Sequence, residues 1–241
     1  MPVTRLNVNQ VSEDKRLYLM VPNTTTSVLA VGNAAWTTAG TLATPAIAST
    51  NLLASVRRTT FSSGTVAGTV ASFRNAQTEL WRGNAAGLGG FLVKIRFGLD
   101  TLQTGMRAFL GIVDVTTASG NVDPTTNTTP GKVGLAINAS TGNWQLVYNL
   151  TGAAPTVLDL GANFPVNTTH LLELTLACSP NDAAISYQVK NLSTGNVANG
   201  SLSTNIPAAA TFMAVQGWIT NNAQAAAAIM AVNKVYVETS Y

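Results

Sequence analysis

The stretch from Glu79 to Gly111 reads ELWRGNAAGLGGFLVKIRFGLDTLQTGMRAFLG, and it decides the fold class. After a turn of small residues at 83–90, every second position is apolar: Phe91, Val93, Ile95, Phe97 and Leu99. Strict period two over this length is typical of a β-strand with one buried face and one wetter face. A second apolar run, 106–113, follows a polar turn. We therefore interpret the stretch as a glycine turn, a long central strand, a turn and another strand.

Strand signals of this kind recur through 51–241, separated by turn-forming pairs such as Asp123-Pro124 and Pro130-Gly131. Strands about 8 to 12 residues apart indicate an antiparallel sandwich or barrel. We find no long amphipathic helix, so the predicted class is all-β, with two sheets stacked face to face. The expected strands are 52–61, 78–82, 91–99, 106–113, 132–137, 144–150, 157–160, 170–178, 184–190, 200–203, 211–220 and 229–238.

Residues 1–50 differ from the rest in composition. They contain short strand-like runs and the low-complexity stretch NAAWTTAGTLATPAIAST at 33–50, which has a single aromatic residue. Such a segment buries little surface by itself, so it is an arm, a linker or a set of strands completed by another chain. We predict an extended N-terminal arm over 1–50, for attachment or contact between subunits, and a sandwich over 51–241.

The overall composition excludes several classes of protein. Only 10% of the 241 residues are charged, and the formal net charge is +3. The one cysteine, Cys178, precludes an internal disulfide and is expected to be a small buried hydrophobic residue. The N-terminus has no apolar segment typical of a secretory signal, and no run reaches the ~18 apolar residues that would span a bilayer. We therefore expect a protein made in a reducing cytosol, without membrane insertion.

Basic residues are concentrated between 57 and 107, a stretch that contains seven of them and only two acidic residues, Glu79 and Asp100. This excess could form an anion-binding patch. Ordinary solvated or interface arginines are the interpretation that we favour. No nucleic-acid-binding module is recognisable, so we expect no nucleic acid partner.

Catalytic and cofactor signatures are absent from the sequence. The glycine turn at 83–90 has neither dinucleotide-binding spacing nor a Gly-Lys-Ser/Thr ending, and a strand follows it rather than a helix. Asp100 and Asp114 could meet as a hydrolytic pair at a sheet end, but no spacing distinguishes them. His170 is the only histidine and lacks a metal-ligand or nucleophile motif nearby. We predict no catalytic residue, no cofactor and no metal.

Candidate contacts to a glycan or to another subunit are Trp81, Arg82, Arg96 and Trp144. Trp144 opens a strand after a turn and could be exposed, whereas Trp81 beside Arg82 could stack on a sugar. Packing inside the protein is the alternative for each tryptophan, and the one that we favour. Arg82 and Arg96 lie on or near the wetter side of the central strand, where a subunit contact could form.

Five segments together resemble a module of virion proteins of tailed bacteriophages: WRGNAAGLGGF (81–91), RFG (96–98), RAFLGI (107–112), SVRRTTFSS (55–63) and VYVETSY (235–241). The resemblance covers about residues 51–241. The virion proteins that this region resembles are tail-fibre, tail-tip or capsid-decoration proteins. It implies a jelly-roll-like or lectin-like sandwich, assembled as a homotrimer on the virion. It implies no catalytic or receptor-binding residue.

The leading hypothesis is a non-enzymatic virion structural protein, a trimeric appendage of the phage tail or head. Its expected partners are sister chains, other virion proteins bound through the N-terminal arm, and host surface polysaccharide. A carbohydrate-binding module is the alternative, and a polysaccharide depolymerase is a third hypothesis.

Overall fold

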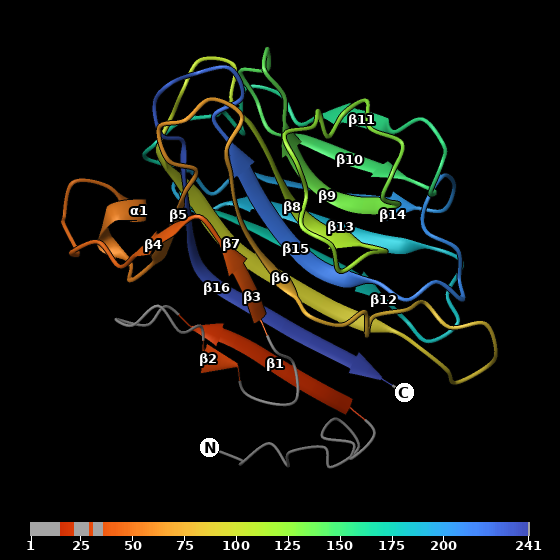
Figure 1. Ribbon diagram of the computed structural model, residues 1–241. Helices are drawn as coiled ribbons and strands as arrows, with labels where there is room; N and C mark the ends of the chain where they lie inside the picture. The colour runs from red at the N-terminus through yellow and green to blue at the C-terminus, as the bar shows by residue number, and fades with distance from the viewer. Residues whose placement is uncertain (1–14, 22–28, 31–35, 241) are drawn as a thin grey trace, which may run out of the picture.

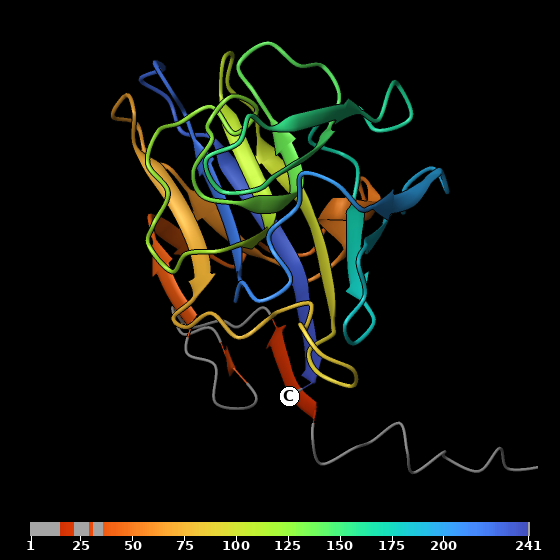
Figure 2. The same cartoon turned by 90° about the vertical axis from the view of Figure 1, so that its right-hand side faces the viewer.

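The computed structural model describes residues 15–21, 29–30 and 36–240. In these residues two antiparallel sheets face each other as a sandwich, seen in Figure 1 and, after a quarter turn, in Figure 2. The described residues form a single helix beside the sheets, the four-residue α1 (Leu52–Ser55). The predicted all-β antiparallel sandwich is thus confirmed. None of the helices in this part of the chain is long and apolar enough to cross a membrane.

Sheet A has the order β14 (Val197–Leu202), β13 (Ile185–Asn191), β12 (Leu172–Cys178), β7 (Phe91–Thr101), β16 (Ile229–Ser240), β1 (Lys15–Val21) and β2 (Leu29–Ala30). Beside this path, β5 (Thr59–Ser62) pairs with the start of β16, and β4 (Thr41–Ala43) pairs with β5. Sheet B has the order β11 (Thr156–Asp159), β10 (Gln145–Asn149), β9 (Lys132–Ile137), β8 (Arg107–Val113), β15 (Ala214–Thr220), β6 (Val70–Asn75) and β3 (Trp36–Ala39).

The central strand is β7, which lies between β12 and β16. Its five apolar residues of one parity are at most 5% exposed and join the main core between the sheets, as predicted. On its other face, Gly98 leaves room for Leu53 of α1, because a Cβ at Gly98 would lie 2.7 Å from the Leu53 side chain. The helix therefore covers this part of sheet A's outer face.

The turn that the sequence predicts before β7 is present, and its backbone conformation requires glycine at several positions. Gly83, Gly89 and Gly90 have φ of +92°, +73° and +92°, a region that L-residues with a side chain rarely adopt. A Cβ at Gly83 would also lie 1.9 Å from the carbonyl oxygen of Leu88. The turn is therefore closed too tightly for any larger residue.

Two predicted strands differ from the structure. Residues 52–55 form α1 instead of a strand, because the Asn51 side chain accepts a hydrogen bond from the Ala54 amide and caps a helical turn. Residues 78–82 form only an isolated bridge between Leu80 and Met213. The buried position predicted for Cys178 is confirmed, at 7% exposed, and Trp218 is buried as well, at 3% exposed.

The segment 1–50 supplies strands to both sheets where the structure describes it. β1 pairs with β16 and β4 with β5 in sheet A, while β3 pairs with β6 in sheet B. The sheets therefore draw strands from both sides of residue 50. Residues 1–14, 22–28 and 31–35 lie outside the described residues. The attachment role predicted for the segment stays a prediction.

A loop over residues 114–131, between β8 and β9, covers the outer face of sheet B. Beneath it lies a second buried cluster of Phe109, Val113, Ala136, Val147 and Trp218, against which Val115 and Val122 pack. Arg74 and Gln216 donate hydrogen bonds to the carbonyls of Thr116 and Thr117 in the loop, at 2.8 and 2.9 Å. The loop is thus bound firmly to the sheet.

Candidate functional site

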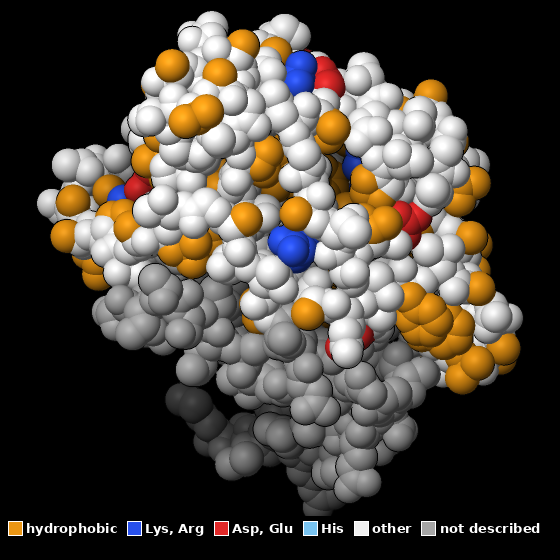
Figure 3. Space-filling model, in the orientation of Figure 1, with side chains coloured by type: hydrophobic (Ala, Val, Ile, Leu, Met, Phe, Trp, Pro, Cys, Tyr) orange, Lys and Arg blue, Asp and Glu red, His pale blue; other side chains and the backbone are white. Residues whose placement is uncertain are grey.

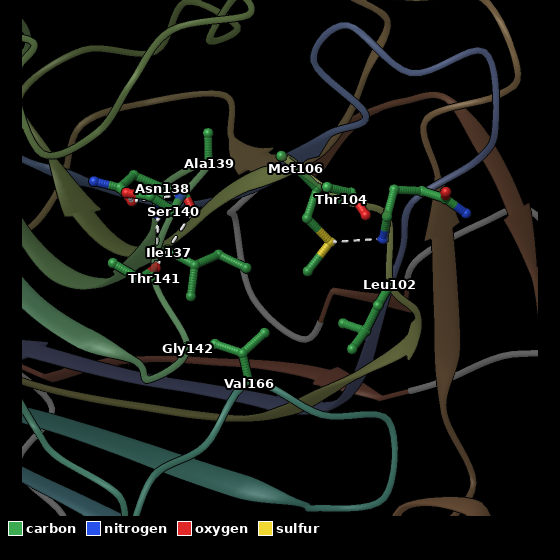
Figure 4. A pocket seen from close by; sticks show the side chains of 12 residues that line it. Leu102, Thr104, Met106, Ile137, Asn138, Ala139, Ser140, Thr141, Gly142 and Val166 are labelled. Carbon is green, nitrogen blue, oxygen red and sulfur yellow. Dashed lines mark hydrogen bonds between the residues drawn. The ribbon is translucent and has the colours of Figure 1, made fainter.

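A cavity of about 440 Å³ opens at the end of the sandwich where β7 stops (Figure 4). One wall is the turn 102–106 between β7 and β8, and the other is the turn 138–142 between β9 and β10. Val166, from the segment that follows β11, completes it. The connection 102–106 from sheet A to sheet B, the hairpin turn 138–142 within sheet B and the crossing segment at Val166 are distant in the sequence and together build one site.

The lining of this pocket is amphipathic and uncharged. Leu102, Met106, Ile137 and Val166 supply apolar side chains, and Met106 and Ile137 are 5% and 1% exposed. The remaining polar lining is amides and hydroxyls, and none of the twelve lining residues is ionisable. A ligand that fits this lining has an apolar face and neutral hydrogen-bonding groups.

Local hydrogen bonds hold the polar wall in place. The Asn138 side-chain oxygen accepts from the amide and the hydroxyl of Ser140, both at 3.0 Å. Its Nδ2 donates to the Thr125 hydroxyl at 3.1 Å. The Thr141 hydroxyl lies 3.2 Å from the Asn138 amide, which donates to it. This wall is therefore pre-organised by its own turn rather than formed around a ligand.

The opposite wall is tied to the rest of the fold. The Gln103 side-chain amide donates to the Ala227 carbonyl at 3.0 Å, and the Gln103 backbone amide donates to the Met106 sulfur at 3.5 Å. Thr104 is exposed, and its hydroxyl makes no hydrogen bond to any residue that the structure describes. Thr104 is thus available to a bound molecule.

For Trp144 the favoured interpretation of packing inside the protein is confirmed, and the possibility that it is exposed is wrong. Trp144 is 2% exposed and meets Phe97 edge to face, with ring centroids 5.0 Å apart. The segment 160–166 covers it, since the Trp144 amide donates to the Phe164 carbonyl and the Trp144 carbonyl accepts from the Leu160 amide. Trp144 is therefore a core residue, and its ring is not accessible to a ligand from solvent.

Arg82 is also buried, at 8% exposed, and is therefore not a surface contact. Its guanidinium donates to the carbonyls of Asp182 and Ala183, at 3.2 and 2.7 Å, and to that of Pro207 at 3.2 Å. Arg82 thus fastens the glycine turn to two other loops. Nothing in the sequence distinguishes such a buried arginine from an exposed one.

Arg96 lies on the outer face of sheet A, in the middle of β7, and is not among the residues that line the pocket. Its guanidinium pairs with Glu173 of β12 at 2.7 Å, and Lys94 lies 3.7 Å from the same carboxylate. Trp81 stacks on Phe212 at 5.0 Å and 18°. The structure therefore keeps Trp81 and Arg82 together, and it brings none of the four predicted residues into the pocket.

Ionisable residues elsewhere form no recognisable catalytic or metal centre in the described residues. No group of three or more His, Cys, Asp or Glu there is placed to hold a metal ion. The His170 Nδ1 lies 3.0 Å from the Asn191 side-chain amide nitrogen. Cys178 is buried, and burial raises the pKa of its thiol to about 11, with Asp182 adding to the effect. A protonated buried thiol is a poor nucleophile.

Comparisons with known proteins identify the type of sandwich. No protein-family model matches the sequence, and no curated protein matches it. Peanut lectin is similar in structure, with a TM-score of 0.61 and 9% identity over 94% of this chain and 97% of that chain. The fold is a lectin-like β-sandwich.

Two further solved structures share this lectin-like sandwich. A Shewanella oneidensis MR-1 protein of unknown function has a TM-score of 0.61 and 12% identity, over 100% of this chain and 96% of that chain. A carbohydrate esterase from the Shiga toxin-encoding bacteriophage phi24B has a TM-score of 0.50 and 14% identity, over 86% and 90% of the two chains. At such identities the likeness establishes the fold alone.

Proposed function

We propose that this protein binds carbohydrate and that the pocket between turns 102–106 and 138–142 takes a neutral sugar unit. The observation that carries the proposal is the lining, which is uncharged, apolar at Leu102, Met106, Ile137 and Val166, and rimmed by hydroxyls and amides. A pyranose ring offers C–H groups on one side and neutral hydroxyls around its edge, so it matches both parts of this lining. The volume of about 440 Å³ falls in the range of small-molecule sites. The likeness to a protein named a lectin supports the same class of ligand.

The test is to fill the pocket without changing its charge. Val166→Phe adds a ring to the pocket, whereas Val157→Phe adds the same ring on the exposed edge strand β11, where Val157 is 38% exposed. Binding to an array of neutral glycans is measured by retention and confirmed by calorimetry. Val166→Phe should weaken binding at least about tenfold, equivalent to about 1.4 kcal/mol. Unchanged affinity in a folded Val166→Phe protein would remove the pocket from the proposal.

We also propose that the protein binds its glycan without cleaving it. The pocket contains no carboxylate, histidine or thiol that could act as acid, base or nucleophile. Incubation with host surface polysaccharide and with acetylated glycans should release neither reducing ends nor acetate. Release of either product by purified protein, lost in a pocket variant, would identify a depolymerase or an esterase instead.

The setting that we propose for this binding is a bacteriophage virion, on which the chain acts as a trimeric appendage of the tail or head. The sequence resemblance of 51–241 to virion proteins supports it, as does the structural likeness to a protein from phage phi24B. In this proposal the segment 1–50 attaches to other virion proteins, and host surface polysaccharide is the ligand. Immunogold labelling of intact particles and mass measurement in solution test it; a stable monomer that never purifies with particles would contradict it.

A further inference from the structure

A second surface with the character of a binding site lies at the other end of β7. Trp81 and Phe212 stack there with ring centroids 5.0 Å apart, and Phe212 and Leu88 are 48% and 40% exposed. We call Trp81, Leu88 and Phe212 the aromatic platform. In Figure 3, hydrophobic side chains gather at the lower right, the region in which Figure 1 places the segment leading into β7. The pocket does not include these residues.

The loops that carry the platform are fixed by buried contacts. Arg82 joins the glycine turn to the segments 182–183 and 207 through three hydrogen bonds to backbone carbonyls. The Asn181 amide donates to the carbonyls of Arg82 and Leu88, at 2.8 and 3.0 Å. The Gly83 amide donates to the Ala209 carbonyl at 3.2 Å. The exposed rings are therefore presented in one arrangement, and a ligand need not order them first.

The size of the platform indicates what it can bind. Side chains of this size present about 150–250 Å² each when fully exposed, so the platform offers roughly 200 Å². A stable protein interface needs about 800 Å² from each partner. The platform is too small to hold a second copy of the chain but is comparable to the face of a single sugar ring.

We propose that the aromatic platform is a second carbohydrate contact, which stacks the apolar face of a pyranose ring on the outward face of the Phe212 ring, with the Trp81 ring stacked on the other face. This proposal rests on the proposed function, because it takes its ligand class from there. Trp81 precedes β7 and its carbonyl accepts from the Gly90 amide, whereas the pocket begins at Leu102, after β7 ends. An extended strand of this length spans about 30 Å, so the two contacts lie at opposite ends of the sandwich. One long glycan, or two chains of a polysaccharide layer, can engage both, and each engagement raises the effective concentration for the other.

Fluorine NMR of protein labelled with 5-fluorotryptophan tests the platform directly. The chain has four tryptophans, and Trp81→Phe assigns the line of Trp81. The ligands are neutral oligosaccharides of glucose, galactose and mannose. We expect a saturable shift of the Trp81 line. Phe212→Ala should weaken the affinity about three- to tenfold, as expected for one aromatic contact. Val66→Ala, which removes a different side chain that is 68% exposed, is the matched control and should change nothing.

Backbone amide shifts of Thr104 and Ser140, recorded on the same samples, report on the pocket. Shifts there without any movement of the Trp81 line would overturn the platform and leave the pocket proposal intact. A Trp81 shift without movement of these amides would support the platform and overturn the pocket. A Trp81 line that moves with protein concentration in the absence of sugar would instead identify a contact between copies. If no sugar moves either reporter, both proposals fail.

Discussion

Replacing Lys132 by methionine should remove a specific pH dependence of stability. Lys132 lies on β9 beneath the loop 114–131, is 3% exposed, and donates from Nζ to the carbonyls of Asn127 and Pro130. Burial lowers the pKa of this amine from 10.5 to about 8, although the Asp114 carboxylate partly opposes the effect. Methionine has a similar length and no charge, so Lys132→Met keeps most of the packing and removes the titration.

The sign and size of the effect follow from the two pKa values. Below about pH 8 the amine is protonated in both the folded and the unfolded chain. Between about pH 8 and 10.5 the unfolded chain keeps the proton that the folded chain has lost, so the free energy of unfolding rises with pH. At about 1.4 kcal/mol per pH unit, the full rise is at most about 3 kcal/mol. Cys178 opposes it in wild type, because its raised pKa of about 11 makes stability fall above pH 9.

The assay is urea unfolding at several pH values between 7 and 10.5, followed by circular dichroism, for wild type and Lys132→Met. The quantity to compare is the difference between the two free energies of unfolding, from which the Cys178 contribution cancels. This difference should rise with pH in favour of wild type. Lys190→Met, which removes a less buried lysine from β13, controls for the loss of one charge. A difference that stays flat or falls between pH 8 and 10 would refute the reasoning.

Three further substitutions test the packing by the same unfolding assay. Trp144→Ala should cost about 3–5 kcal/mol, as for other large buried aromatics, and a loss below 1 kcal/mol would mean that the residue is not in the core. Gly111→Ala places a Cβ 2.2 Å from the Val133 carbonyl oxygen, so β8 and β9 must separate. It should cost at least about 1–3 kcal/mol; wild-type stability would contradict this close approach. Arg82→Met leaves three carbonyls without their donor and should cost about 3 kcal/mol, with broadened NMR lines for Trp81; sharp lines would show that other contacts fix the platform.

The fold could be predicted largely because β-strand periodicity is local. In β7 every second residue enters the core, and the positive φ of Gly83, Gly89 and Gly90 follows from a turn that only glycine fits. The strand predicted at 52–55, where the structure has the helix α1, is wrong for a different reason. Leu52 to Ser55 has no period that separates helix from strand, and the Asn51 cap decides the outcome through a single side-chain hydrogen bond.

The candidate site was harder to predict, because its residues are far apart in the sequence and lie close together only once the strands have paired. The turns 102–106 and 138–142 meet because β8 pairs with β9, in a register that places Ala108 opposite Ile137. The burial of Trp144 and Arg82 was hard to predict for a related reason. Exposure at a strand end depends on whether another segment crosses it, and the segments 160–166 and 182–183 are distant in sequence from the residues that they cover.

The loop 114–131 bears on where a ligand can reach the sandwich. Arg74 and Gln216 bind one limb of this loop, and Asn149 and Lys132 bind the other, all by donating to its carbonyls. A ligand on the outer face of sheet B would have to break these bonds and expose the apolar cluster beneath, at about 25 cal/mol for each Å² uncovered. The two ends of β7 require neither step, since the pocket and the aromatic platform are already open to solvent. A saccharide at these ends therefore displaces fewer of the protein's own contacts than one on the outer face of sheet B, which is a physical reason for placing both proposed contacts there.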